Sequence, residues 1–182
     1  MCGIAGVVAF TEAGKDSLKG LEEAVYCLRK RGPDSEGFYR DGNVALGQTR
    51  LAVIDTSERA SQPMTDASGR YTLIFNGEFF NFKEHRQFVL SKGYTLKSQS
   101  DSEVLLYLYM SEGEKCLQRM NGFFAFAIYD KEEQSVFIAR DRMGVKPLLY
   151  FRDQDKFVFA SEMKSLIRLG IPKEIDRDSL DR

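Results

Sequence analysis

The feature that most constrains the fold is a series of short, strand-like segments joined by polar turns. Four such segments follow one another in the C-terminal half of the chain, at residues 123–129, 135–141, 148–151 and 157–161. The polar stretches 130–134 and 153–156 join them as hairpins. Because hairpins pair strands antiparallel, whereas a doubly wound parallel sheet needs helical crossovers, the pattern predicts an α+β protein with mainly antiparallel sheets.

The N-terminal half adds further strands and places its helices in blocks. Strands are predicted at residues 3–10, 44–54 and 71–75, and the polar stretch 55–69 is predicted to be a loop. Apolar residues with helical spacing predict a helix from Ser17 that ends before the sequence Arg31-Gly32-Pro33. Two more helices are predicted, one at 82–91 and one that begins at Ser100, which has the capping-box spacing with Glu103.

Length and charge limit the classes of protein to consider. For 182 residues we expect one domain at 1–170 and a linker at 171–182, where the apolar pattern fades. The 26 basic and 27 acidic residues leave a net charge of -1, which argues against a nucleic-acid partner. No apolar run approaches the roughly 18 residues of a membrane span, and the N-terminus lacks the basic region of a signal peptide. We therefore expect a cytoplasmic protein without a membrane partner.

The sparse histidines and cysteines exclude several kinds of site. His85 is the one histidine, and it lies in a predicted helix, where a packed or half-exposed side chain is expected. The three cysteines, Cys2, Cys27 and Cys116, lie far apart and form no zinc-binding pattern, so we expect no metal site. We expect Cys27 and Cys116 to be buried structural thiols. A nucleophile in this chain would need a base other than histidine.

Cys2 offers such a combination of nucleophile and base. Removal of Met1 would leave Cys2 with a free α-amine, whose ordinary pKa is about 7.7–8.0, and a thiol, whose ordinary pKa is about 8.5. One residue would then carry both the nucleophile and the general base. A Met-Cys start is also consistent with an incidental small residue after the initiator, so the rest of the sequence must decide.

Four other residues have the chemistry that would act with Cys2. Asn76 and Gly77 follow a predicted strand and could supply two N–H donors to an oxyanion, although an Asn-Gly pair also forms plain turns. Arg50, among strand residues, suits a carboxylate, or it is a surface arginine. Asp101 begins a predicted helix, where it could cap the helix or receive an ammonium. Together, Arg50 and Asp101 would recognise the α-end of an amino acid.

These residues belong to an ordered set of short motifs that runs from residue 2 to about 168. In chain order the motifs are Cys2-Gly3-Ile4-Ala5-Gly6, Arg31-Gly32-Pro33-Asp34, Thr49-Arg50-Leu51-Ala52-Val53-Ile54-Asp55, Gln62-Pro63-Met64, Phe75-Asn76-Gly77-Glu78-Phe79-Phe80-Asn81, Ser100-Asp101-Ser102-Glu103, Asn121-Gly122-Phe123-Phe124-Ala125-Phe126, Arg140-Asp141-Arg142-Met143-Gly144-Val145-Lys146-Pro147-Leu148 and Ala160-Ser161-Glu162-Met163-Lys164. By this set the chain resembles the glutaminase domain of class II glutamine amidotransferases, the N-terminal-nucleophile type. It most resembles that of glutamine-hydrolysing asparagine synthetases.

The resemblance implies a fold and a role for each matching residue. The fold would be a four-layer αββα sandwich of the N-terminal-nucleophile hydrolase type. Cys2, after loss of Met1, would attack the side-chain amide of glutamine and release ammonia and then glutamate. The other site residues would be Asn76 and Gly77 as the oxyanion hole, Arg50 for the α-carboxylate, Glu78 and Asp101 for the α-amino end, and Leu51 and Val53 as backbone lining. For the motif at 31–34 only a loop-shaping role can be argued.

The resemblance also implies a partner and leaves alternatives open. These residues contain neither the pyrophosphate-binding Ser-Gly-Gly-x-Asp-Ser loop of the synthetase half nor a P-loop. We therefore expect no cofactor in this domain, and ATP and Mg only in a synthetase domain of a longer parent chain, which would be its partner; a homodimer is left open. The alternatives are coupling to a different acceptor of ammonia, a non-catalytic regulatory module, and a self-processing hydrolase with a peptide substrate, which would not need the paired Arg50 and Asp101.

Overall fold

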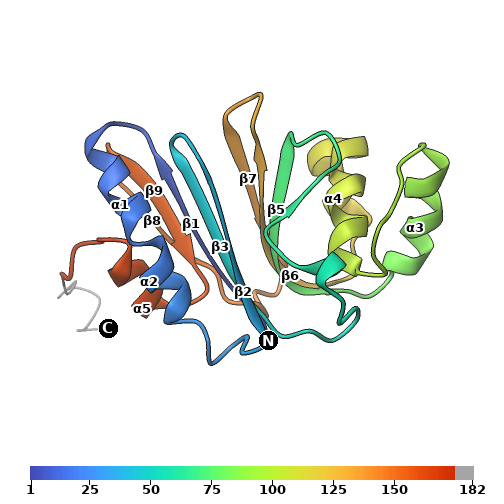
Figure 1. Cartoon of the computed structure of the whole chain (residues 1–182), viewed down its shortest axis with the longest axis horizontal. Helices are drawn as coiled ribbons and strands as arrows, with labels where there is room; N and C mark the ends of the chain where they lie inside the picture. Colours follow the sequence, from blue (N-terminus) through green and yellow to red (C-terminus); the bar gives the residue numbers. More distant parts are fainter. Residues whose placement is uncertain (175–182) are drawn as a thin grey trace.

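Two antiparallel β-sheets pack face to face in the computed structural model, which describes residues 1–174 (Figure 1). The five-stranded sheet has the order β2-β3-β1-β9-β8, and the four-stranded sheet has the order β4-β5-β6-β7. Every pair of neighbouring strands is antiparallel. The strands are β1 (Gly3–Ala9), β2 (Ser35–Asp41), β3 (Val44–Arg50), β4 (Met64–Thr65), β5 (Tyr71–Phe79), β6 (Gly122–Asp130), β7 (Ser135–Arg140), β8 (Leu149–Arg152) and β9 (Lys156–Ala160).

Helices cover the outer face of each sheet, so the expected αββα layering and the α+β class are confirmed (Figure 1). The five-stranded sheet carries α1 (Asp16–Lys19), α2 (Leu21–Tyr26) and α5 (Met163–Arg168). The four-stranded sheet carries α4 (Asp101–Glu112), with α3 (Phe82–Ser91) outside it. Short 3₁₀ turns lie at Ala13–Lys15, Glu58–Ala60 and Gly113–Gln118. Within residues 1–174, no helix is both long and apolar enough to cross a membrane.

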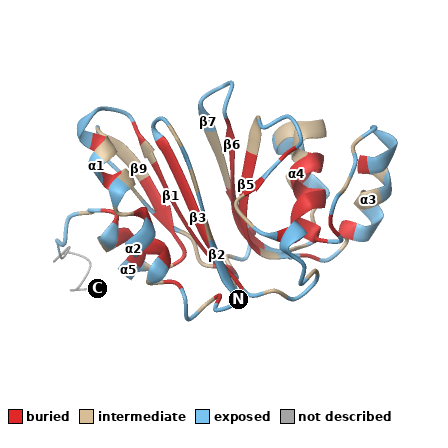
Figure 2. Ribbon diagram, viewed as in Figure 1, coloured by how far each residue is buried: buried red, intermediate tan, exposed pale blue. Residues whose placement is uncertain are grey.

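The apolar contact between the two sheets forms the central core. Figure 2 shows the strands that face each other largely in red, the colour of buried residues. The side chains between the sheets are Ile4, Val44, Leu46, Ile74, Ala125, Ala127, Tyr129 and Phe159. A Cβ on Gly6 would lie 2.3 Å from the ring of Phe159, so the absence of a side chain at this position lets the ring lie against β1.

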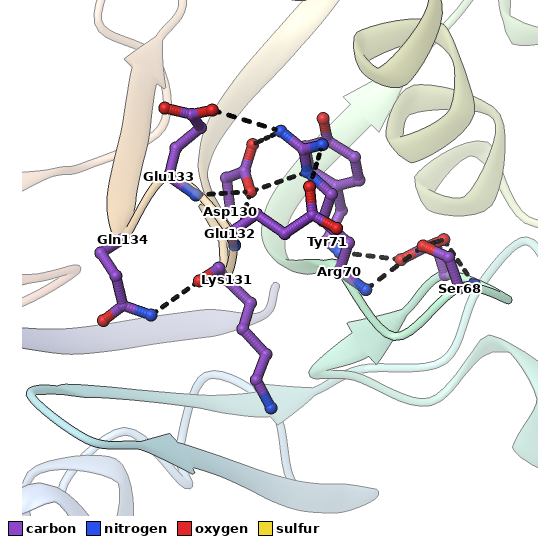
Figure 3. A network of polar contacts seen from close by, with 9 residues as sticks. Ser68, Arg70, Tyr71, Asp130, Lys131, Glu132, Glu133 and Gln134 are labelled. Carbon is purple, nitrogen blue, oxygen red and sulfur yellow. Dashed lines mark hydrogen bonds and ion pairs between the residues drawn. The ribbon is translucent and has the colours of Figure 1, made fainter.

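A cluster of charged side chains joins the strands at one end of the four-stranded sheet, where β5 begins. Figure 3 shows Arg70 facing the acidic turn after β6. The Arg70 guanidinium donates to both carboxylate oxygens of Asp130, at 2.8 and 2.7 Å, and also pairs with Glu132. This cation holds the pKa of Asp130 below its ordinary value. The pairing joins the start of β5 to the hairpin of β6 and β7, and leaves the opposite end of β5 free for the site described below.

The predicted segments agree with the structure in order and type, with the differences that follow; one is β4, which lies in the stretch 55–69 predicted to be a loop. The helix predicted from Ser17 is divided at Gly20, where a Cβ would lie 2.4 Å from the carbonyl oxygen of Arg168. The strand β2 was not predicted, because it alternates exposed and half-buried residues at a sheet edge. The strand predicted at 44–54 ends at Arg50, and the strand predicted at 71–75 continues to Phe79.

The C-terminal part differs in one further element. Helix α5 was not predicted, and it follows β9 after only two residues, Ser161 and Glu162. It buries Ser165 and Leu166 against the five-stranded sheet. Of the linker expected at 171–182, residues 175–182 lie outside the described part of the chain.

The central core makes a direct prediction about stability. Leu46 is completely buried between the sheets, so Leu46→Ala should lower the free energy of unfolding by about 2–5 kcal/mol. Leu90 on α3 is 40% exposed, and the same substitution there should cost less than about 1 kcal/mol. Urea unfolding of both variants measures the difference. Equal losses would contradict the placement of the core between the sheets.

Candidate functional site

The predicted site residues surround one cleft at the end of the two central sheets. Cys2 precedes β1, Arg50 ends β3, Asn76 and Gly77 lie near the end of β5, and Asp101 begins α4. The cleft has a volume of about 110 Å³, which suits a ligand much smaller than a drug-sized molecule. Its lining includes all eight predicted residues, which are Cys2, Arg50, Leu51, Val53, Asn76, Gly77, Glu78 and Asp101. The structure thus brings together residues that are up to a hundred positions apart in the chain.

Both the thiol and the main-chain carbonyl of Cys2 make polar contacts with neighbouring segments. The backbone N–H of Leu51 lies 3.4 Å from Sγ, and Sγ lies 3.8 Å from the carbonyl oxygen of Leu51. The main-chain carbonyl of Cys2 accepts a hydrogen bond from Arg31 Nε at 2.9 Å. Burial raises the pKa of the Cys2 thiol, while the Leu51 N–H and the Arg50 cation oppose that rise. Because Met1 precedes Cys2 in the sequence, the Cys2 nitrogen is a peptide nitrogen until Met1 is removed.

Two glycines allow the backbone segments around Cys2 to approach closely. A Cβ on Gly3 would lie 2.8 Å from the Leu28 side chain and 2.9 Å from Thr49 Oγ1. A Cβ on Gly32 would lie only 2.5 Å from the backbone of Thr49. Larger residues at either position would push the segments apart. The loop that carries Arg31 therefore lies directly against the start of β1 and the end of β3.

The amide of Asn76 is buried without a partner. Asn76 is 1% exposed, and neither its nitrogen nor its oxygen has a hydrogen-bond partner among the described residues. It lies within β5, opposite Ala125 of β6, so the simple Asn-Gly turn is excluded and the predicted strand end was wrong. An unpaired buried amide costs roughly 1–3 kcal/mol, so a polar group that entered the cleft, whether a water or a ligand, would stabilise it. A Cβ on Gly77 would lie 2.5 Å from the carbonyl oxygen of Phe123, so only glycine fits beside Asn76.

Arg50 joins the end of β3 to the loop that forms one wall of the cleft. Its guanidinium is buried and donates to the carbonyl oxygens of Ser57, at 3.0 Å, and Asp55. These bonds use two of the five N–H donors of an arginine, so donors remain for a carboxylate ligand. Val53 lies on the same loop and is 69% exposed, which places it at the rim of the cleft.

Asp101 and Glu78 add two carboxylates to the lining of the cleft. Asp101 is buried and accepts the N–H of Phe79 at 3.0 Å and that of Ser102 at 2.9 Å. Burial raises the pKa of Asp101, and the nearby Glu78 carboxylate raises it further. The helix cap is Ser100, whose side chain accepts the N–H of Glu103, so Asp101 is not needed for capping. Two carboxylates facing a small cleft suit a cationic ligand group.

Three residues had no predicted chemical role: Lys146, which lines the cleft, and Arg31 and Glu162, which lie beside Cys2. Arg31 contacts the carbonyl of Cys2 and pairs with Glu162 at 3.1 Å. Lys146 is 7% exposed, and its Nζ lies 3.5 Å from Sδ of Met1. Each of the three lies in a motif that the sequence analysis identified, but the motif alone gives no indication of its target. Only the folded arrangement shows that Arg31 and Glu162 meet beside Cys2.

The histidine, His85, and the two other cysteines, Cys27 and Cys116, do not line the cleft. His85 is half-buried and stacks on Phe79 with ring centroids 5.6 Å apart, as expected for a packed helix residue. Cys116 is completely buried, and burial raises its pKa to about 12. Cys27 is only partly buried, so that prediction was wrong; it lies beside the face of α2 that packs on the sheet. Within residues 1–174, no group of three or more His, Cys, Asp or Glu is arranged to hold a metal ion.

Comparison with known proteins identifies relatives over the whole chain. A family model described as "Glutamine amidotransferase domain" matches residues 1–182. "Asparagine synthetase [glutamine-hydrolyzing] 3" of Bacillus subtilis is 38% identical over 183 residues, which cover 99% of this chain and 30% of that protein. "Amidase chry2" of Gibberella zeae is 31% identical over 185 residues, which cover 96% of this chain and 27% of that protein. The chain thus spans less than a third of the length of these relatives.

The fold is also similar to that of solved structures. The glutamine phosphoribosylpyrophosphate amidotransferase of B. subtilis superposes with a TM-score of 0.75 over 93% of this chain and 44% of that chain. The sequence identity is 23%, so this likeness concerns the fold. It supports the same arrangement of two antiparallel sheets between helix layers.

The thiol environments predict how the chain that retains Met1 reacts with iodoacetamide. Because the pKa of the Cys2 thiol is raised, its alkylation rate should reach half of its maximum at a pH above about 8.5, the ordinary thiol pKa. Cys116 should react only after unfolding. Timed alkylation followed by peptide mass spectrometry measures each rate. A Cys2 rate that levels off below pH 8.5, or labelling of native Cys116 at neutral pH, would contradict these environments.

Proposed function

This chain belongs to the glutamine amidotransferase domain family, and we propose that it hydrolyses the side-chain amide of glutamine with Cys2 as an N-terminal nucleophile. The observation that carries the proposal is one cleft that holds the Cys2 thiol, the unpaired Asn76 amide, the Arg50 guanidinium and the Asp101 carboxylate. Each of these groups matches a different part of a glutamine molecule. A non-catalytic module would not need to retain all of them in one small cleft.

Charged residues that line the cleft would bind the α-carboxylate and the α-ammonium of glutamine. The spare donors of Arg50 would hold the α-carboxylate, and Asp101 with Glu78 would hold the α-ammonium. Leu51 and Val53 would contact the substrate from the loop after β3. A zwitterionic amino acid thus meets groups of opposite charge at each end of its α-carbon. The side-chain amide would then point toward Cys2.

The reaction would proceed through a thioester on Cys2. The free α-amine takes the thiol proton as Sγ attacks the amide carbon, and the resulting oxyanion accepts hydrogen bonds from Asn76 and Gly77. The α-ammonium returns a proton to the leaving nitrogen, which departs as ammonia. Water, deprotonated by the same amine, then attacks the thioester, releasing glutamate and restoring the thiol. Removing one oxyanion donor of this kind typically costs about 10²–10³ in kcat.

Loss of Met1 is the step that would complete the site. In the chain that retains Met1, Leu51 already contacts the Cys2 thiol and Arg31 already contacts its carbonyl. The one missing component is a titratable amine on the same Cα. No metal or other cofactor is required for this chemistry, and we propose that the domain uses none.

We further propose that the ammonia serves an asparagine synthetase domain in a longer parent chain, in the cytoplasm. The support is that the B. subtilis relatives are named glutamine-hydrolysing asparagine synthetases and are about three times as long as this chain. ATP and Mg would then be needed only in that other domain. A different acceptor of ammonia is the second candidate, because a relative named "Amidase chry2" matches nearly the whole chain as well.

The first test is turnover of glutamine by the processed chain. Chain lacking Met1, verified by N-terminal mass spectrometry, should release ammonia and glutamate in equal amounts. Cys2→Ala should reduce this release to background, because it removes the nucleophile, whereas Cys27→Ala should leave it unchanged. Turnover by Cys2→Ala at the parent rate would rule out Cys2 as the nucleophile.

The second test is the pH dependence of glutamine binding, measured by calorimetry with the Cys2→Ala chain. The pKa of Asp101 is raised, so its carboxylate becomes protonated at a higher pH than the ordinary value of about 3.9. As the pH is lowered, the affinity for glutamine should therefore start to fall at a higher pH than the one at which an ordinary aspartate is protonated. Asp101→Asn should bind weakly, without this dependence.

Asp130→Asn provides the control for that test. Asp130 lies at the opposite end of β5 and does not line the cleft, so its loss should leave the pH dependence of binding unchanged. The same acidic fall in affinity in Asp101→Asn would mean that another group binds the α-ammonium.

A further inference from the structure

The motifs Arg31-Gly32-Pro33-Asp34 and Ala160-Ser161-Glu162-Met163-Lys164 have no part in the chemistry proposed above. The fold brings them together beside Cys2. Arg31, from the first of the two, donates from Nε to the main-chain carbonyl of Cys2 at 2.9 Å. Its Nη1 donates to Oε1 of Glu162, from the second, at 3.1 Å. A continuous chain of polar contacts therefore runs from Glu162 through Arg31 to the nucleophile residue.

The backbone next to Glu162 is fixed to the strand that begins at Cys2. The N–H of Ile4 donates to Ser161 Oγ at 2.9 Å, and the N–H of Ser161 donates to the carbonyl oxygen of Ile4 at 2.9 Å. Both residues are buried. These reciprocal bonds set the position of the backbone at Glu162 relative to Cys2, and the ion pair with Arg31 then directs its carboxylate.

The Arg31 end of this contact chain is largely withdrawn from water. The Arg31 side chain is 13% exposed, and its Nη2 has no partner among the described residues. The second carboxylate oxygen of Glu162 pairs with Lys164 at 2.7 Å. Lys164 and Arg31 together hold the pKa of Glu162 below its ordinary value, so the carboxylate is ionised at neutral pH. A shielded guanidinium needs such a counter-charge to remain in place.

We propose that Glu162 is a positioning residue for the nucleophile, which it serves by holding the Arg31 guanidinium against the main-chain carbonyl of Cys2. The inference rests on the proposed glutaminase function. After loss of Met1, Cys2 is the end of the chain, and terminal residues fray unless they are tied down. Because the carbonyl carbon, the α-nitrogen and the thiol-bearing carbon share one Cα, fixing the carbonyl restricts the directions of the amine and the thiol.

The test is Glu162→Gln in the processed chain, which keeps the shape of the side chain and removes its charge. Misplacement of a reacting group by about 1 Å can cost up to about 10²-fold in rate, so kcat for glutamine hydrolysis should fall about ten- to a hundred-fold. Arg50 and Asp101 do not contact Glu162, so KM for glutamine should stay within about two-fold of the parent value. The rate of alkylation of Cys2 by iodoacetamide should fall together with kcat.

Glu36→Gln is the matched control. Glu36 also pairs with an arginine, Arg29, through two short hydrogen bonds of 2.9 and 2.7 Å, but this pair does not contact Cys2 or the cleft. The control should keep kcat, KM and Cys2 reactivity at parent values. N-terminal mass spectrometry of every variant confirms that Met1 has been removed, so that incomplete processing is not counted as a slower reaction.

The outcomes separate the inference from the function on which it rests. A parent-like kcat and parent-like Cys2 reactivity in Glu162→Gln would overturn the positioning role, as would a raised KM with unchanged kcat. If Glu162→Gln is unfolded at the assay temperature, Glu162→Asp replaces it, and a lowered kcat at constant KM supports the role while parent values overturn it. If the parent does not hydrolyse glutamine, the proposed function fails, and the alkylation rates alone decide whether Glu162 positions Cys2.

Discussion

The packing of the two sheets against each other is the constraint on which the site depends. Cys2 directly precedes β1 and Arg50 ends β3 of the five-stranded sheet, whereas Asn76 and Gly77 belong to β5 of the four-stranded sheet. Their separation is therefore set by the apolar side chains between the sheets and not by local chain geometry. One polar contact fixes the alignment further, since the Gln48 side chain on β3 donates to the carbonyl oxygen of Phe75 on β5 at 2.9 Å. A shift of either sheet would separate the thiol from the amide that faces the same cleft.

Local sequence patterns were sufficient to predict the hairpins and the two longer helices. They were insufficient where contacts with distant segments determine the secondary structure. The C-terminal hairpins and the helix Phe82–Ser91 lie where the sequence predicts them, because turn residues and apolar periodicity act over a few residues. The break at Gly20 depends on the carbonyl of Arg168, which no local pattern contains. Strand β2 is stabilised by pairing with β3 while its own side chains stay largely exposed, so its composition carries little strand signal.

For the candidate site, the sequence indicated the residues whose functional groups suit catalysis or binding. It did not indicate a role for the charged residues that contact Cys2 only in the folded structure. Cys2, Arg50 and Asp101 attract attention because of their functional groups and places in the chain. Their convergence on one cleft could be expected only from the family resemblance, and the structure shows it directly. Arg31 and Glu162 are ordinary charged residues in sequence, and their contact depends on the close approach that Gly32 permits. The roles of the site residues themselves stay predictions.

The pairing of β1 has a consequence for how the protein is made. β1 lies between β3 and β9, and Ala5 pairs with Gly47 on one side and with Ala160 on the other. During synthesis β9 is the last of the described strands to leave the ribosome, so one edge of β1 stays unpaired until residue 160 has emerged. Contacts between such distant segments form late in folding. A processing peptidase can therefore reach Met1 while residues up to 160 are being made, before the strand that follows it is enclosed on both sides.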